Sequence, residues 1–285
     1  MKVLVFFSGG KDSQAALIHS VHRYGAQRCE AVFCDTGWEH PLTYEHIETA
    51  CKQLGVKLVT LKGKYNGMID LAVNKGRFPS TKARFCTEEL KSKPAIDYVI
   101  SHSEHLIIIE GIRKNESFSR SKMEPECMYF RYYYEPMANG KKHTYRSKDV
   151  RTWCKEWNAD KIRPVFDWTA QMVIDYILSN GQQPNPLYYQ GFKRVGCFPC
   201  IMSRHADIKL IVDNHPKESQ RLIDAEDKVG TTFFPPDYIP RRFCTNKKYP
   251  TVSDIEKYLS DKNATMDMFD DGGQPGCMSM YGLCE

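Results

Sequence analysis

The sequence predicts an α/β fold in which helices cover both faces of a doubly wound, mainly parallel sheet. Short apolar segments of strand length alternate with segments of helical pattern in the first part of the chain. The apolar segments lack the alternation with polar residues that marks a strand with one face in water. Glycine and proline stand at the ends of the helical segments, where they stop or start a helix. Together these observations predict parallel strands that are buried on both faces.

The predicted elements follow one another in a regular order. Gly25 and Gly55 end the first two helices, and Pro41 begins the second. The predicted strands are 3–7, 31–34, 56–61 and 106–109, and the predicted helices are 14–24, 41–54 and 88–101. Because ligands of such sheets bind beyond the carboxyl ends of the strands, the residues that follow each strand are the candidates for function.

Composition narrows the class of protein. The 285 residues suffice for an α/β domain with a further C-terminal part, and the formal net charge of +5 mildly favours a polyanionic partner. No apolar run reaches membrane-spanning length and no signal peptide is visible, so a soluble, cytoplasmic protein without membrane contact is expected. In that compartment the 11 cysteines are expected to be reduced thiols or metal ligands rather than disulfides.

A phosphate-binding loop is predicted directly after the first strand. Two adjacent glycines allow a tight turn and a close approach to an anion, and the following helix offers unpaired N–H groups and the positive end of its dipole. A lysine adds a positive charge and two serines add hydroxyl donors. An ordinary strand-to-helix turn is the alternative. The residues predicted to bind the phosphates are Ser8, Gly9, Gly10, Lys11, Asp12 and Ser13.

A polar turn follows the second predicted strand, at Asp35, Thr36 and Gly37. A carboxylate in this position accepts hydrogen bonds from a ribose or helps to hold Mg²⁺. The alternative is a plain turn, since Asp and Gly both favour turns. The phosphate loop on the neighbouring strand favours the nucleotide-binding role.

Two arginines follow the fourth predicted strand, which ends before Gly111. Arg113 and Arg120 offer planar, bidentate donors that suit phosphate or sulfate oxyanions. Glu116 lies between them in the sequence and is suited to orient one of them through an ion pair. A solvated charged loop is the alternative. The position after a buried strand favours anion binding, with Gly111 and Arg113 at the nucleotide and both arginines beside the departing anion.

Six motifs, in this order, resemble those of the phosphoadenosine phosphosulfate reductase family, which belongs to the ATP pyrophosphatase superfamily with its adenine nucleotide α-hydrolase-like fold. They are S-G-G-K-D-S at 8–13, D-T-G at 35–37, R-x-C-T-x-x-L-K-x-x-P at 84–94, G-x-R-x-x-E-S-x-x-R at 111–120, P-x-x-D-W at 164–168 and N-P-L-Y-x-x-G-x-x-R-x-G-C-x-x-C at 185–200. The resemblance implies a nucleotide-binding domain over 1–200, with an insertion at about 121–157.

The remaining residues, 201–285, are expected to form a mostly helical extension that carries cysteines. Helices are predicted at 216–229 and 254–259. Ser253 and Glu256 are predicted to form a capping box at the start of the second.

The resemblance leaves two sulfur chemistries open. In one, the loop holds ATP, an oxygen of the substrate is adenylylated with release of pyrophosphate, and a sulfur species then displaces AMP. In the other, a thiol attacks phosphoadenylyl or adenylyl sulfate and sulfite is released. Lys11 and Asp12 favour the first chemistry, because a triphosphate requires extra charge neutralisation. These two residues are predicted to be catalytic together with Arg113 and Arg120.

The resemblance also implies cofactors and partners. The expected small molecules are ATP, or the sulfonucleotide in its place, together with Mg²⁺. The expected partner protein is a sulfur donor or a thiol reductant. A nucleotide-binding regulatory module with structural zinc is the alternative from outside the enzymes.

Four cysteines are predicted to bind a metal cofactor. Cys197 and Cys200 form a C-x-x-C pair after a loop, which suits a metal site better than a redox dithiol. Cys86 is implied by the resemblance of its motif to the cluster motif of adenylyl sulfate reductases. Cys244 is the expected fourth ligand, with Cys277 as the substitute. Thiolates suit either a [4Fe–4S] cluster or zinc, and the resemblance favours the cluster.

Two other segments have open interpretations. Cys284 stands near the C-terminus, where sulfonucleotide reductases carry a nucleophilic cysteine, and the alternative is an incidental thiol. The insertion carries aromatic residues at 129–134 followed by lysines and arginines, a pattern suited to base stacking and phosphate contact with tRNA or DNA. A solvated β-hairpin that turns at Asn139 and Gly140 is the alternative.

Overall fold

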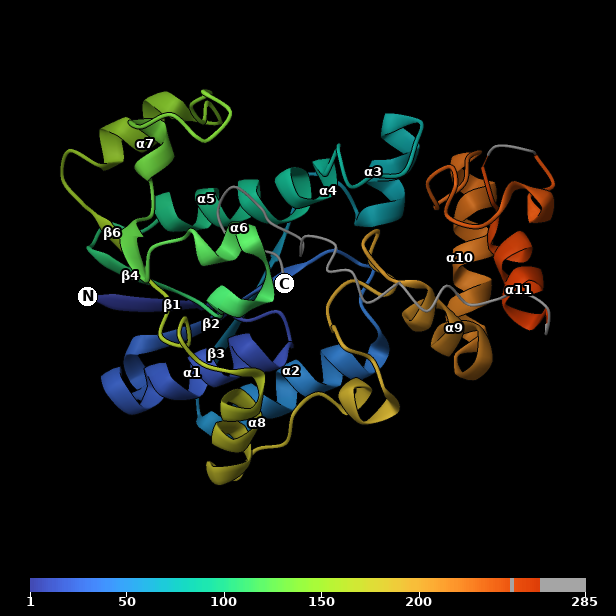
Figure 1. Cartoon of the computed structure of the whole chain (residues 1–285). Helices are drawn as coiled ribbons and strands as arrows, with labels where there is room; N and C mark the ends of the chain where they lie inside the picture. The colour runs from blue at the N-terminus through green and yellow to red at the C-terminus, as the bar shows by residue number, and fades with distance from the viewer. Residues whose placement is uncertain (247–248, 262–285) are drawn as a thin grey trace.

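The computed structural model describes residues 1–246 and 249–261, and a six-stranded sheet lies at its centre (Figure 1). The strand order is β3-β2-β1-β4-β6-β5. Neighbouring strands are parallel except β5, which runs antiparallel to β6 at one edge. The strands are β1 (Lys2–Phe6), β2 (Cys29–Asp35), β3 (Lys57–Lys62), β4 (Leu106–Glu110), β5 (Glu126–Met128) and β6 (Ala159–Ile162). This architecture confirms the predicted doubly wound α/β fold.

Helices connect the strands and form the C-terminal extension. Helices α1, α2 and α8 cover one face of the sheet, and α5 and α7 cover the other (Figure 1). Among the described residues, no helix is both long and apolar enough to cross a lipid bilayer. The α-helices are α1 (Lys11–Tyr24), α2 (Pro41–Leu54), α3 (Met68–Lys75), α4 (Phe85–Thr87), α5 (Lys93–Ile100), α6 (Phe118–Ser121), α7 (Ser147–Trp153), α8 (Ala170–Ser179), α9 (His205–Asn214), α10 (Pro216–Val229) and α11 (Val252–Ser260).

Alternate residues of the central strands supply two separate apolar cores. In β1, Val3 and Val5 pack with α1, α2 and α8 on one face. Leu4 and Phe6 pack with α5, α7 and the insertion on the other. All four side chains are buried. Because both faces are covered, the strands are continuous apolar runs in the sequence, and this made them predictable.

A third apolar cluster joins the C-terminal extension to the sheet domain. Helices α9, α10 and α11 pack together, and α10 also packs against α3. Trp38, which follows β2, is 1% exposed within this cluster. Its indole N–H donates a hydrogen bond to the carbonyl oxygen of Pro199 at 2.9 Å. The extension is therefore attached beside the carboxyl end of β2.

Local sequence explains where the observed helices differ from the predicted ones. Helices α2 and α10 have the predicted bounds, and α1 begins at Lys11 rather than at residue 14. The predicted helix 88–101 is divided into a π-helical turn, Glu88–Ser92, and α5. Pro94 lacks the N–H that a continuous α-helical ladder needs at this point, which accounts for the division.

The start of α11 differs from the predicted capping box at Ser253 and Glu256. Thr251 is the capping residue, because its hydroxyl accepts a hydrogen bond from the Asp254 amide at 3.2 Å. Asp254 in turn accepts from the Thr251 amide at 3.0 Å. The reciprocal pair therefore lies two residues earlier in the chain than the predicted one, and the predicted box is wrong.

The segment 121–157, which is predicted to be an insertion, contributes β5 to the sheet and then continues as turns and α7. Asn139 and Gly140 do form a turn, in which the Gly140 amide donates to the Met137 carbonyl at 2.8 Å, but no hairpin of strands surrounds it. Tyr129, Phe130 and Tyr133 are at most 1% exposed and fill the core with β4 and α5. These three rings are therefore unable to stack on nucleic-acid bases, whereas Tyr134 is 38% exposed, so contact of this segment with nucleic acid stays a prediction.

Candidate active site

The phosphate loop connects β1 to α1 in a compact turn. The Ser13 hydroxyl donates to the Gly10 carbonyl at 3.0 Å, and the Ser8 amide donates to the Ser13 hydroxyl at 3.3 Å. Gly9 has a φ of +82°, and a Cβ at this residue would lie 2.8 Å from Thr43 Cγ2. Only glycine therefore suits this position. The turn leads into the N-terminus of a 14-residue helix, the arrangement that binds anions.

Gly111 brings the end of β4 against the start of α1. A Cβ at Gly111 would collide with the backbone of Asp12 and Ser13. The contact lies between β1 and β4, where the order of the sheet changes direction, because β2 and β3 lie on one side of β1 and β4 and β6 on the other. Open α/β sheets bind their ligands at such a switch point. The predicted loop and the predicted Gly111 therefore meet at the expected place.

The N-P-L-Y segment supports the loop from the opposite side. Tyr188 Oη accepts a hydrogen bond from the Lys11 amide at 3.1 Å, and Lys11 Nζ lies 5.1 Å from the centre of the Tyr188 ring. Asn185 is fully buried and donates to the Gly9 carbonyl at 3.3 Å. These contacts span more than 170 residues of sequence, so only the motif hinted at them.

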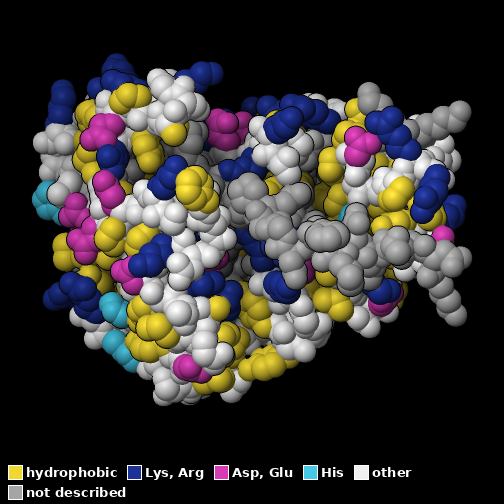
Figure 2. All heavy atoms as spheres, in the orientation of Figure 1, with side chains coloured by type: hydrophobic (Ala, Val, Ile, Leu, Met, Phe, Trp, Pro, Cys, Tyr) yellow, Lys and Arg dark blue, Asp and Glu magenta, His cyan; other side chains and the backbone are white. Residues whose placement is uncertain are grey.

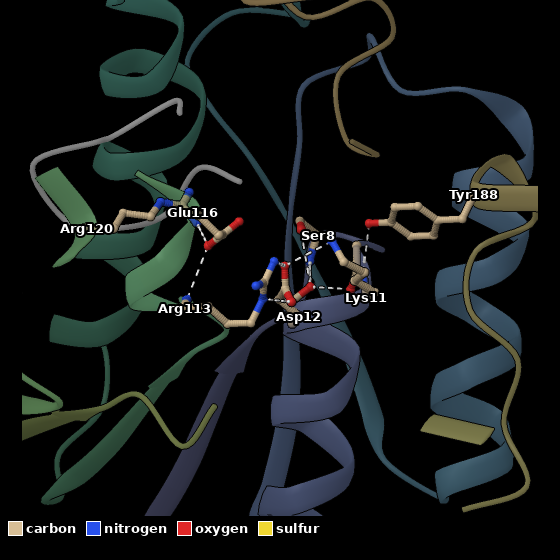
Figure 3. Close-up of polar contacts among 9 residues, drawn as sticks. Ser8, Lys11, Asp12, Arg113, Glu116, Arg120 and Tyr188 are labelled. Carbon is tan, nitrogen blue, oxygen red and sulfur yellow. Dashed lines mark hydrogen bonds and ion pairs between the residues drawn. The ribbon is translucent and has the colours of Figure 1, made fainter. Parts of the chain in front are cut away.

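Acidic and basic side chains alternate from the loop towards α6 (Figure 3). Asp12 Oδ1 accepts a hydrogen bond from Arg113 Nε at 2.5 Å, and Asp12 Oδ2 lies 3.3 Å from Lys11 Nζ. Glu116 accepts from the Arg113 amide at 3.2 Å and forms an ion pair with Arg120. The structure therefore brings together the four residues predicted to be catalytic in the motifs at 8–13 and 111–120.

The charged side chains in this row differ in burial, and this indicates different roles for them. Arg120 is 1% exposed, so it orients Glu116, and direct contact with a departing anion does not fit its position. Both carboxylate oxygens of Asp12 face cations, so this residue holds Lys11 and Arg113 in place. That arrangement leaves Asp12 poorly suited to contact Mg²⁺. The cations that remain for a nucleotide are Lys11 and Arg113.

A cleft of about 500 Å³ opens beside the loop, over the carboxyl ends of β1, β2 and β4. Apolar residues of the strand ends, such as Phe33, form much of its lining. Glu39, Lys91 and Glu110 supply side-chain charges there. Sequence reasoning assigned no role to these three, although Lys91 is the lysine of the motif at 84–94 and Glu39 lies two residues after the D-T-G turn.

The D-T-G turn is fixed by two carboxylates. Asp35 Oδ1 accepts from the Gly37 amide and from the Tyr44 hydroxyl, each at 2.8 Å. Glu39 accepts from the Thr36 hydroxyl at 2.6 Å and from the Tyr44 hydroxyl at 3.0 Å. Burial and the two nearby carboxylates raise the pKa of Tyr44 far above its ordinary value, so its hydroxyl stays a donor. Asp35 is therefore engaged in ordering the turn, and its contact with a nucleotide stays a prediction.

Glu110 is paired with two buried cations at the cleft. Lys161 Nζ lies 3.0 Å from Glu110 Oε1, and Arg163 Nη2 lies 3.0 Å from Glu110 Oε2. All three side chains are buried. Two positive charges balanced by one negative charge leave an excess of positive charge at this point. That excess favours an anionic ligand in the cleft.

The four cysteines predicted to bind metal lie near one another without forming a compact ligand set. Cys197 and Cys200 line a second cavity, of about 420 Å³. Cys86 packs against the apolar cluster that contains Cys244. A zinc ion holds its thiolates about 3.8 Å apart, whereas among the described residues no three cysteine sulfurs lie within 4.8 Å of one another. The described cysteines therefore do not fit a preformed zinc site.

The surroundings of single cysteines also differ. Cys197 Sγ lies 3.6 Å from the Thr36 hydroxyl and 3.9 Å from Glu39 Oε1. Burial, followed by the charges of Asp254 and Asp237, raises the pKa of the Cys244 thiol. Since metals bind the thiolate, this raised pKa disfavours Cys244 as a metal ligand. Cys277 and Cys284 lie outside the described residues.

His40, His215 and Glu218 form the single His and Glu group of metal-ligand type within residues 1–246 and 249–261. His40 Nδ1 accepts a hydrogen bond from the Leu42 amide at 3.1 Å, so the neutral ring carries its proton on Nε2. His40 Nε2 lies 3.5 Å from Glu218 Oε1 and is placed to donate to it. With its proton there, this nitrogen is not a metal ligand, and the group is a hydrogen-bonded junction between α2 and α10.

A model of the phosphoadenosine phosphosulfate reductase domain matches residues 2–203. The chain belongs to the phosphoadenosine phosphosulfate reductase domain family. This confirms the resemblance in the sequence motifs, and it supports a nucleotide-binding enzyme of sulfonucleotide or adenine nucleotide chemistry. The exact reaction is a separate question, because several chemistries share this domain.

Members of this family with related sequences include proteins without a described activity. An uncharacterised 37.8 kDa protein of Escherichia phage 186 is 29% identical, over 90% of this chain and 84% of its own length. An uncharacterised protein of Methanocaldococcus jannaschii is 30% identical over 75% of this chain, which spans 39% of that relative. An adenosine 5'-phosphosulfate reductase of Neisseria meningitidis is 51% identical over 41 residues, or 14% of this chain and 17% of the reductase.

Among solved structures, a phosphoadenylyl-sulfate reductase from Candida auris in its phosphate complex is similar to this chain. The TM-score is 0.49 at 17% sequence identity, over 70% of this chain and 83% of that structure.

Proposed function

We propose that this protein is an ATP-dependent enzyme that adenylylates an oxygen of its substrate and then transfers sulfur to the activated position. The observation that carries the proposal is the pair of cations, Lys11 and Arg113, held on either side of Asp12 at the end of the phosphate loop. A triphosphate needs more charge neutralisation than a single phosphate group, and two fixed cations beside a helix N-terminus supply it. The family and the position of the cleft support an adenine nucleotide as the ligand.

In the proposed reaction the loop amides and the Ser8 and Ser13 hydroxyls bind the β- and γ-phosphates. The substrate oxygen attacks the α-phosphorus, the bond from that phosphorus to the bridging oxygen breaks, and pyrophosphate leaves with its charge balanced by Lys11 and Arg113. Mg²⁺ bound to the phosphates accompanies ATP. A sulfur nucleophile then attacks the activated carbon, and AMP leaves.

The adenosine is proposed to occupy the cleft beside the loop, over the carboxyl ends of β1, β2 and β4. Phe33 and the other apolar strand-end residues pack against the base and ribose. Lys91 and the excess positive charge at Glu110, Lys161 and Arg163 add to the attraction for the nucleotide.

For the sulfur step we propose Cys197 and Cys200 as the centre, because they line one cavity next to the turn that borders the nucleotide cleft. A [4Fe–4S] cluster on these two cysteines, Cys86 and one further ligand is the cofactor proposed from the family chemistry. Such a cluster would supply a binding site for sulfur.

Reduction of adenylyl sulfate is the second candidate. It is favoured by the segment of 41 residues that is 51% identical to an adenosine 5'-phosphosulfate reductase. In that reaction a thiol of the protein attacks the sulfonyl sulfur, AMP leaves, and a second thiol releases sulfite as a disulfide forms. Cys284 stays the predicted nucleophile for this alternative.

One experiment separates the two candidates. The full chain is purified without oxygen, its iron, sulfide and zinc contents are measured, and it is incubated either with ATP and Mg²⁺ or with adenylyl sulfate and a dithiol. With total tRNA or DNA fragments as acceptor, we expect pyrophosphate from ATP, and we expect matched iron and sulfide. Lys11→Ala is expected to lower the rate by at least about 100-fold, since it removes one of the two cations at the leaving group.

Lys114→Ala is the matched control, because Lys114 is the neighbour of Arg113 but pairs with Asp167 on the surface. It is expected to keep the wild-type rate. Sulfite from adenylyl sulfate, without pyrophosphate from ATP, would establish the reductase instead. Zinc in place of iron would remove the cluster from the proposal.

A further inference from the structure

The segment from residue 62 to residue 84 concentrates the positive charge of the molecule. It contains six lysines and arginines and one acidic residue, Asp70. Its formal charge of +5 equals that of the whole chain, so the remaining residues are neutral as a set. The six cations are Lys62, Lys64, Lys75, Arg77, Lys82 and Arg84.

The fold places this basic segment beside the proposed nucleotide cleft. A Cβ at Gly63 would lie 2.5 Å from the Glu89 carbonyl oxygen, so the start of the segment lies against the residues that follow its end. Its helix α3 starts against the end of β2, where the Met68 amide donates to the Thr36 carbonyl at 2.8 Å. Shortly after the segment, Lys91 lines the cleft. Figure 2 shows a group of dark-blue side chains over the region of α3 and α4.

Most of these cations are not neutralised by neighbouring carboxylates. Lys62 Nζ lies 3.6 Å from Asp35 Oδ2. Within the described part of the chain, none of the other five forms an ion pair. Lys64, Lys75, Arg77 and Lys82 are also exposed. A single exposed cation is ordinary, but several unpaired ones in one segment repel each other and attract a polyanion.

Aromatic rings are interleaved with the cations. The Arg77 guanidinium lies 5.6 Å from the centre of the Phe85 ring, and Lys64 Nζ lies 5.8 Å from the centre of the Tyr65 ring. Phe85 and Tyr65 are both partly exposed. Rings and cations in alternation suit unpaired bases and their phosphates, whereas an acidic protein would use the charges alone.

We propose that the basic segment, residues 62–84, binds single-stranded nucleic acid and presents an unpaired base to the nucleotide cleft. The inference rests on the proposed function, of which it names the substrate class. The base carbonyl is then the oxygen that is adenylylated. The surface differs from the insertion, where Tyr129, Phe130 and Tyr133 are buried.

The test measures binding of fluorescent single-stranded RNA and DNA oligonucleotides to the full chain without ATP, at several salt concentrations. The variant Lys75→Glu/Arg77→Glu/Lys82→Glu reverses three exposed cations of the basic segment. Lys141→Glu/Lys142→Glu/Lys148→Glu is the matched control, because it reverses three exposed cations of the insertion with the same change in net charge.

We expect the first variant to bind at least about 30-fold more weakly and the control to stay within about 3-fold of wild type. The slope of log affinity against log salt should fall by about 2 in the first variant, as three lost phosphate contacts imply. The RNA and DNA arms identify which polymer is bound. If circular dichroism shows that the triple variant does not fold, the salt dependence of binding is measured instead with Lys75→Glu, which removes one phosphate contact.

Equal losses in both variants, no binding by the wild type, or displacement by polyglutamate as efficient as by oligonucleotide would each overturn the proposal. Equilibrium dialysis with ATP keeps this outcome apart from the proposed function. The triple variant should bind ATP normally, and Lys11→Ala should bind the oligonucleotide normally. Failure of ATP binding in the wild type would count against the nucleotide site alone.

Discussion

The phosphate loop and the junction with the C-terminal extension meet the same end of the sheet but are stabilised differently. At the loop, Gly111 lies against the backbone of Asp12 and Ser13 and Gly9 lies against the side chains of Thr43 and Ile47, so neither has room for a side chain. At the junction, Arg221 bridges the turn after β2 and the C-x-x-C loop, donating to the carbonyls of Trp38 and Phe198. The loop depends on glycines that leave room for close packing, and the junction depends on the side chain of Arg221.

The largest effect is expected at the loop. Gly111→Ala places a Cβ against the backbone of Ser13, which has no free rotation to move away. We expect a loss of at least about 4 kcal/mol in the free energy of unfolding, because neither backbone segment can shift without disturbing β4 or α1. Urea unfolding followed by circular dichroism measures it.

Gly181→Ala is the control for that substitution. Gly181 has a φ of +71° but has no atom within 4 Å of an added Cβ, so the change introduces strain without a collision. A cost of about 1 kcal/mol is expected there. Equal losses in the two variants would show that the loop does not depend on the close approach.

An intermediate effect is expected at the junction. Arg221→Met removes hydrogen bonds to the Trp38, Phe198 and Glu39 carbonyls and the stacking of the guanidinium, 4.1 Å from the centre of the Trp38 ring. We expect a loss of about 2–4 kcal/mol in the free energy of unfolding, since hydrogen bonds from a charged donor are lost while the methionine keeps much of the apolar contact.

Arg241→Met is the matched control, because Arg241 pairs with Asp237 on an exposed surface. It should change stability by less than about 0.5 kcal/mol. If Arg221→Met unfolds like this control, the junction is stabilised by its apolar cluster, and the contrast with the loop disappears.

The smallest effect concerns α2, which runs from the junction past the loop. Burial lowers the pKa of His46 to about 4, from an ordinary 6.5. The unfolded chain binds a proton at this imidazole more tightly than the folded protein does. The free energy of unfolding is therefore unaffected by His46 above pH 6.5 and decreases progressively as the pH falls from 6.5 towards 4. Between pH 8 and pH 5 the loss is about 2 kcal/mol.

His46→Phe should reduce the loss of stability between pH 8 and pH 5 by that amount, as measured by urea unfolding at both pH values. His22→Phe removes an exposed histidine of α1 and should leave the loss unchanged. An unchanged pH dependence in His46→Phe would mean that the imidazole of His46 has the same pKa in the folded protein as in the unfolded chain.

The part of the molecule that could be predicted from sequence is the part encoded by neighbouring residues. A strand, two glycines and a helix start are adjacent in the chain, so the turn from β1 to α1 that carries Lys11 and Asp12 was predicted, whereas its binding of phosphate stays a prediction. The same holds for α2 and α10, whose proline starts and glycine ends are local.

Tertiary packing decided the rest. The sequence shows charge at Arg120 and aromatic character at Tyr129, but it does not show that each is 1% exposed. The role of Glu110 could not be predicted, because it ends an apolar strand and its partners Lys161 and Arg163 lie about 50 residues away in the sequence. Pattern alone therefore assigned the motifs correctly but not the task of each side chain within them.

The contact between Gly63 and Glu89 has a consequence for how this protein can vary. A stretch whose two ends already touch changes its length without displacing the strands that flank it, because the entropy of loop closure grows only slowly with length. The flanking strands thus keep their places, and α3 is held by its packing against α10, so only the loops on either side of α3 are free to change in length. In the proposed complex, such changes would alter how far the segment extends over the nucleic acid.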